Sequence, residues 1–128
     1  MFEYVKNDTG GGFPVMKELK ATAGSYEVGD ALALDTATGL LKIAAGTVKP
    51  QYISASKKTV TTEDAILAVN PVYEGQEWKV KFSVDGSAVK VGSSVTIDTT
   101  GRMITATTTG GVFLVTENLG TEAVGKFM

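Results

Sequence analysis

The side chains best suited to catalysis and metal binding are scarce in this sequence. The 128 residues include no histidine and no cysteine, which excludes thiolate nucleophiles, cysteine-based zinc sites and histidine general bases. The closest carboxylate pairs are Glu74 with Glu77 and Glu63 with Asp64. Both pairs lie in predicted turns, where acidic side chains are ordinarily solvated, and neither lies in a calcium-loop pattern. The sequence therefore predicts a protein that is not an enzyme and that binds no metal or cofactor.

Two other segments have residue types that could bind or carry a ligand. Gly10, Gly11 and Gly12 could cradle a phosphate, but a phosphate loop follows a strand and opens a helix, and neither is predicted here. We interpret the three glycines as a hinge. The segment 15–17 is similar to the Met-Lys tip of biotinyl and lipoyl carrier domains, but the neighbouring Pro14 and Glu18 depart from that pattern. An exposed strand lysine is the favoured interpretation of Lys17, and covalent modification is the alternative.

Three aromatic residues could form a platform for a sugar or a single-stranded nucleic acid, namely Tyr52, Tyr73 and Trp78. Strict alternation over residues 78–84 predicts that Trp78, Val80, Phe82 and Val84 point into the core. Tyr73, which lies in a loop, is the better candidate for a surface contact.

The composition predicts a single all-β domain. Hydrophobic residues make up 43% and charged residues 20% of the chain, with 15 glycines, and β-branched residues with frequent glycine favour short strands and tight turns. The net charge of −2 gives no basic patch for nucleic acid. No apolar run approaches the roughly 20 residues of a membrane span, and residues 1–6 have no signal architecture. We expect no nucleic-acid or membrane partner and synthesis in the cytoplasm.

The strongest pattern is an internal repeat. Residues 28–36 (VGDALALDT) return at 91–99 as VGSSVTIDT, and a glycine and a further apolar stretch follow each copy. Each copy predicts a β-hairpin that reverses at an Asp-Thr turn. Asp35 and Asp98 are expected to accept hydrogen bonds from amides of these turns rather than to act as acids or bases.

The remaining segments complete a small β-barrel or sandwich of short strands. Further strand candidates are residues 13–21, 51–55, 65–69, 78–84, 112–115 and 123–128, and no stretch has convincing helical periodicity. The apolar run 65–69 predicts a strand buried on both faces. The breaker cluster 7–12 predicts a flexible N-terminal arm over residues 1–12, ahead of a single domain over 13–128.

The two hairpins, together with residues 66–78 (ILAVNPVYEGQEW), resemble the head decoration proteins of tailed bacteriophages over most of residues 20–128. The resemblance implies a small β-rich structural protein, commonly trimeric, that binds the major capsid protein on the virion surface and stabilises the shell by bridging neighbouring subunits. It also implies that the N-terminal arm becomes ordered on the shell. Phe2, Tyr4 and Val5 in the arm could add a strand to a partner's sheet edge. The alternative is a non-catalytic β module that binds a carbohydrate or a receptor, with Tyr73 at its surface.

Overall fold

The computed structural model describes residues 1–8, 15–61 and 65–128, and all of the secondary structure in them is β. The predicted all-β class is therefore confirmed. The sheets are antiparallel and remain open, which is compatible with a small sandwich and not with a closed barrel. The strands are β1 (Glu3–Asn7), β2 (Lys17–Lys20), β3 (Gly24–Tyr26), β4 (Ala31–Leu34), β5 (Leu41–Ile43), β6 (Tyr52–Ser54), β7 (Lys58–Val60), β8 (Ile66–Pro71), β9 (Gln76–Lys81), β10 (Ser94–Val95), β11 (Phe113–Asn118) and β12 (Glu122–Phe127).

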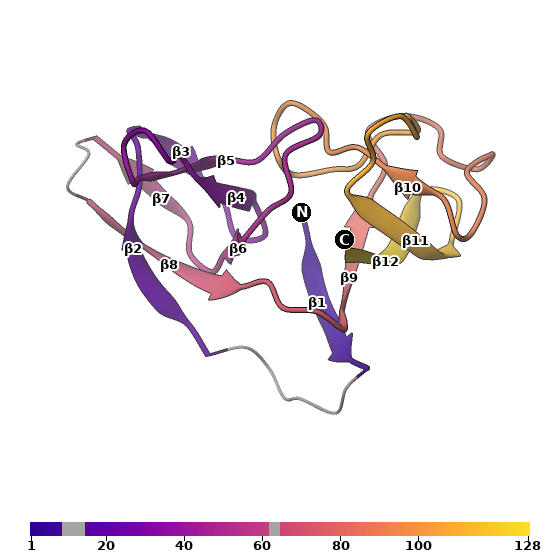
Figure 1. The fold of residues 1–128 in the computed structure, drawn as a ribbon, viewed down its shortest axis with the longest axis horizontal. Coiled ribbons are helices and arrows are strands. Elements are labelled where there is room, and N and C mark those ends of the chain that lie inside the picture. The colour runs from indigo at the N-terminus through magenta and orange to yellow at the C-terminus, as the bar shows by residue number, and fades with distance from the viewer. Residues whose placement is uncertain (9–14, 62–64) are drawn as a thin grey trace.

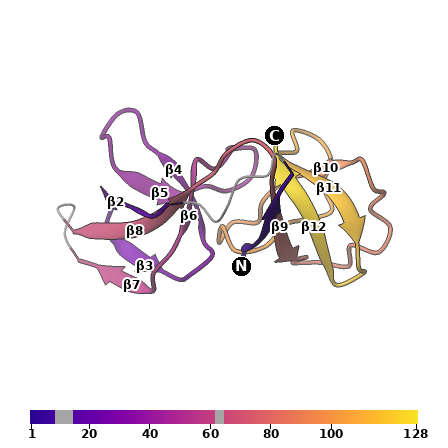
Figure 2. The same cartoon turned by 90° about the horizontal axis from the view of Figure 1, so that it is seen from below.

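The strands form two lobes that lie side by side (Figures 1 and 2). In the first lobe, a sheet of order β2-β8-β6-β4-β5 is accompanied by the two-stranded β3-β7 sheet. In the second lobe, the order is β1-β9-β12-β11-β10. The chain passes from the first lobe to the second between β8 and β9, while β1 alone comes from the start of the chain.

The two lobes have the same topology, which extends the sequence repeat to almost the whole chain. Strands β2, β8, β6 and β4 correspond in order to β9, β12, β11 and β10. Their registers also correspond. Lys17 of β2 lies opposite Val69 of β8, and at the corresponding place in the second lobe Trp78 of β9 lies opposite Gly125 of β12. An isolated parallel bridge connects Ala21, just after β2, with Leu41 of β5 in the first lobe, and another connects Phe82, just after β9, with Ile104 in the second.

Both hairpins predicted from the repeat are present. In the first, β4 and β5 pair from Leu32 with Ile43 to Leu34 with Leu41. In the second, the ladder is shorter and is marked by the bridge between Ile97 and Ile104. The turns close in the same way, because Asp35 N donates to Leu40 O and Asp98 N donates to Met103 O, each at 2.9 Å.

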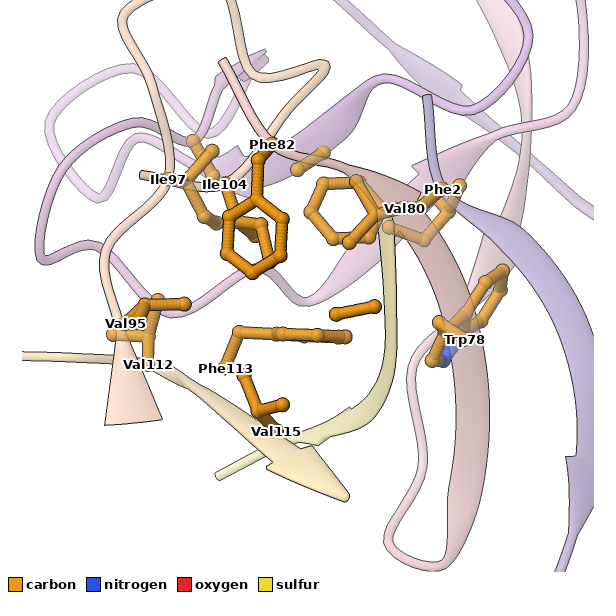
Figure 3. Close-up of a cluster of buried hydrophobic side chains, with 14 of the residues drawn as sticks. Phe2, Trp78, Val80, Phe82, Val95, Ile97, Ile104, Val112, Phe113 and Val115 are labelled. Carbon is orange, nitrogen blue, oxygen red and sulfur yellow. The ribbon is translucent and has the colours of Figure 1, made fainter. Parts of the chain in front are cut away.

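Two hydrophobic clusters fill the lobes, and the larger one also joins them. Its centre is formed by residues of the second lobe, including Trp78, Val80 and Phe113, and Figure 3 shows these side chains converging. Ala31 and Ile53, which belong to strands of the first lobe, pack into the same cluster. The smaller cluster lies inside the first lobe. The lobes therefore share buried apolar surface, which favours a fixed arrangement between them.

Two burial predictions require correction. Trp78, Val80 and Phe82 are buried as the alternation predicts, but Val84 is 55% exposed because β9 ends at Lys81 and the chain then turns. The run 65–69 is not buried on both faces. Ile66 is 45% exposed, because a curled sheet covers only its inner face.

The described part of the predicted arm, residues 1–8, is paired with the second lobe. Residues 3–7 form β1, which pairs with β9 at the edge of the second lobe. Phe2 is 3% exposed, and its amide donates to Gly29 O at 2.9 Å. The aromatic side chains of Phe2 and Tyr4 pack against aromatic residues of the second lobe. Gly10, Gly11 and Gly12, the predicted hinge, lie outside the described residues.

Candidate functional site

The two repeat aspartates lie at the hairpin turns and bind their own turns. The Asp35 carboxylate accepts a hydrogen bond from Ala37 N at 2.9 Å. The Asp98 carboxylate accepts from Arg102 N at 3.3 Å and from Met103 N at 3.2 Å. Both carboxylates therefore bind backbone amides of their own turns.

The three residues predicted to contact a partner differ in how far they are buried. Phe2 packs its ring at 5.7 Å from Phe113 and 4.9 Å from Phe127. Tyr4 stands edge-on to Trp78 at 5.5 Å. Val5 lies at an irregularity in the β1-β9 register and is 45% exposed. Of the three predicted residues, Val5 therefore presents the most accessible apolar side chain, on an edge strand that has β9 on one side.

A buried ion pair between the lobes was not predicted from the sequence. Asp30 is fully buried and accepts hydrogen bonds from Arg102 Nε at 2.9 Å, Arg102 Nη2 at 3.4 Å and Glu27 N at 2.8 Å. The hydrogen bond that Arg102 donates to the Asp30 carboxylate is the main cause that raises the pKa of Arg102 above its ordinary value. A signal was present in the repeat, because Ser93 replaces Asp30 in the second copy. An acidic residue that is present in only one copy indicates a contact that only one lobe makes.

Two adjoining hollows lie on the side of the molecule where β8 leads to β9. The inter-lobe hollow, with a volume of about 580 Å³, is lined by residues that include Asp8, Glu74, Leu114, Lys126 and Phe127. The end hollow, with a volume of about 520 Å³, is lined by residues that include Lys17, Gln51, Tyr52 and Pro71. Lys49, Val72 and Tyr73 line both. A third hollow of about 350 Å³ lies beside β9, where Lys79 pairs with Glu122 at 3.1 Å.

Only two of the three predicted platform residues, Tyr52 and Tyr73, are brought together. Tyr73 is 56% exposed and Tyr52 is half-buried, and both line the end hollow. Trp78 is 2% exposed and belongs to the core. The end hollow therefore combines two tyrosines with Lys17 and Lys49, the only charged residues among its described lining residues. This combination suits an apolar or aromatic group that carries a negative charge.

The two carboxylates of the pair Glu74 and Glu77 have different surroundings. Glu77 pairs with Lys6 at 3.4 Å, whereas Glu74 lines the inter-lobe hollow. Glu63 and Asp64 lie outside the described residues. Within residues 1–8, 15–61 and 65–128, no group of three or more acidic side chains is placed to hold a metal ion.

No helix in the described ranges is long and apolar enough to cross a membrane. The chain matches no protein-family model, and no curated protein or solved structure matches it.

Proposed function

We propose that this chain is a structural protein of a tailed-phage virion that binds the outer surface of the head and bridges neighbouring copies of the major capsid protein. The observation that carries the proposal is the duplication of the lobe within one chain. A capsid presents the same subunit many times at fixed spacing. Two related lobes that share one hydrophobic cluster can contact two neighbouring subunits at once.

The energetic advantage of this arrangement is multivalency. Once one lobe is bound, the second encounters its site at a high effective concentration, so two weak contacts give a strong attachment. The apolar surface shared by the lobes and the Asp30–Arg102 pair hold their spacing fixed. Fixed spacing reduces the entropy lost when both lobes bind. A bridging protein of this kind resists separation of the subunits that it joins.

The contact surface that fits this function lies at exposed strand edges. Within the described residues, β1 is the outermost strand of its sheet and carries the exposed side chain of Val5. An added strand from a capsid subunit would extend the sheet by backbone hydrogen bonds. Phe2 is buried, so a direct contact through Phe2 would require β1 to leave β9. We place the protein on the virion surface after synthesis in the host cytoplasm. Trimerisation is proposed from the family resemblance.

The proposal is tested by adding the purified protein to expanded phage heads that lack it and following co-sedimentation. We expect saturable binding at a fixed ratio to the capsid subunit, and an increase in the temperature at which the heads break open. Unexpanded heads, whose subunit spacing differs, serve as the control. Absence of binding, or heads that are equally heat-stable with and without the protein, would contradict the proposal.

A second candidate function is the binding of a carbohydrate or receptor without catalysis. The observation in its favour is the exposure of Tyr73 at the boundary of two hollows. A glycan array with the wild type and with Tyr73→Ala tests it. Loss of specific glycan signals in the variant supports carbohydrate binding, and an array without signals contradicts it.

A further inference from the structure

The end hollow of the first lobe corresponds to the place that Phe2, the residue before β1, fills in the second lobe. Corresponding strands carry corresponding residues: Tyr52 lies opposite Pro71 in the first lobe, and Phe113 lies opposite Phe127 in the second. In the second lobe, Phe2 packs against both Phe113 and Phe127. In the first lobe, Tyr52 and Pro71 line the end hollow.

The strand edges beside these two places also correspond. In the second lobe, β1 pairs along β9, with Tyr4 opposite Trp78. In the first lobe, β2 corresponds to β9, and Lys17 holds the position of Trp78. Within the described part of the chain, β2 has β8 on one side and no strand on the other. Val15 and Met16, just before β2, are 81% and 61% exposed.

We propose that the end hollow and the open edge of β2 form a docking site for an extended segment of a partner protein. The segment adds a strand to β2, as β1 does to β9, and places an apolar or aromatic side chain in the end hollow. It carries an acidic side chain toward Lys17 and Lys49, which supply all of the charge among the described lining residues. In the proposed function, on which this identification of the partner rests, the segment belongs to the major capsid protein.

The N-terminal strand of a second copy fits this site poorly. In the β1-β9 register, Glu3 lies opposite Lys79, and the residue of β2 that corresponds to Lys79 is Glu18. Glu3 would therefore meet a like charge, which is unfavourable for residues directly opposite on neighbouring strands. Removing β1 from its own chain would also expose Phe2. Charge complementarity thus favours a segment from a different protein.

The register of the second lobe allows a probe peptide to be designed. The probe copies residues 1–8 with Glu3→Lys and Tyr4→Glu, so that its lysine lies opposite Glu18 and its glutamate lies opposite Lys17. The control peptide has lysine at both positions. Each is titrated into the ¹⁵N-labelled full chain, and amide resonances are followed by NMR, which detects binding as weak as about millimolar.

We expect the probe to shift the amide resonances of β2 and of Tyr52 and to bind about tenfold more tightly than the control, because one cross-strand pair changes from attraction to repulsion. In Lys17→Glu, whose side chain is exposed in the wild type, the preference should reverse. Shifts confined to the second lobe, equal affinity for both peptides, or no shifts at about millimolar probe would overturn the docking site.

Binding to expanded heads separates this inference from the proposed function. If the capsid subunit is the occupant, Lys17→Glu and Tyr52→Ala bind heads at least about tenfold more weakly than the wild type. Wild-type and variant proteins that bind heads equally would overturn the capsid subunit as occupant and leave the proposed function standing. Peptide binding without any head binding by the wild type would sustain the docking site and contradict the proposed function.

Discussion

Phe2 fastens β1 to the second lobe, and its replacement by alanine is expected to destabilise the fold by about 3 kcal/mol. The side chain is 3% exposed and contacts the rings of Phe113 and Phe127. Burial of a phenylalanine that is truncated to alanine typically contributes about 3–5 kcal/mol. The lower end applies here because β1 is an edge strand and can move to fill part of the cavity. For a chain of this length, about 3 kcal/mol lowers Tm by about 12 °C.

Urea unfolding followed by the fluorescence of Trp78, the single tryptophan, measures this change directly in the second lobe. The matched control is Val5→Ala on the same strand, since Val5 is 45% exposed and its truncation should cost less than about 1 kcal/mol. The urea dependence of the unfolding free energy should be unchanged in both variants. A Phe2→Ala protein as stable as Val5→Ala would refute the reasoning, because β1 would then be detached in solution as the sequence predicts.

Three further perturbations test the turns, the lobe junction and the surface charges. Gly92→Ala should lower the unfolding free energy by about 1 kcal/mol because of the positive φ alone. Gly29→Ala should lower it further, because an added Cβ would lie 2.9 Å from the carbonyl oxygen of Phe2. Equal losses of stability in urea unfolding would contradict this contact. Asp30→Ala should lower the unfolding free energy by about 2–3 kcal/mol, which is less than for a fully buried pair because the Arg102 side chain is 34% exposed. A double-mutant cycle with Arg102→Met measures the coupling energy of the pair. The hydrogen bond that Lys126 donates lowers the pKa of Asp8 below its ordinary value of 3.8. The stabilisation is therefore present above pH 3.8 and is lost as the pH falls through the lower pKa of the folded state. Asp8→Asn should flatten the acid side of a plot of urea midpoint against pH, and an unchanged plot would count against the pair.

The fold class could be predicted from the sequence because it depends on local patterns. Alternation over residues 78–82 fixes one inward face whatever the partner strands are, and Trp78 is accordingly buried. The glycine-containing turns of the repeat close the two hairpins for equally local reasons. Val84 shows the limit of this reasoning, since the alternation continues in the sequence after the ladder has ended at Lys81.

The duplication of the whole lobe could not be predicted because register is fixed by backbone hydrogen bonds that leave side chains free to diverge. Lys17 and Trp78 occupy the same position without chemical similarity. The Asp30–Arg102 pair joins residues 72 positions apart, so no local pattern contains both. The pairing of β1 with β9 is also long-range. A glycine-rich breaker indicates that a strand ends but does not indicate where the preceding segment packs.

The divergence at position 17 leads to a last prediction, which separates stability from binding. Lys17 lines the open end hollow of the first lobe. At the corresponding position of the second lobe, Trp78 is buried in the core. Lys17→Leu would cover apolar surface next to Tyr52 and should raise the unfolding free energy by about 0.5–1 kcal/mol. If the open end is retained for a partner, the same variant should bind expanded heads more weakly because the acidic group of the segment loses its counter-charge. Lys17→Arg, which keeps the charge, is the control for binding. A Lys17→Leu protein that is less stable than the wild type would assign Lys17 a structural role and remove the reason for regarding the hollow as a retained site.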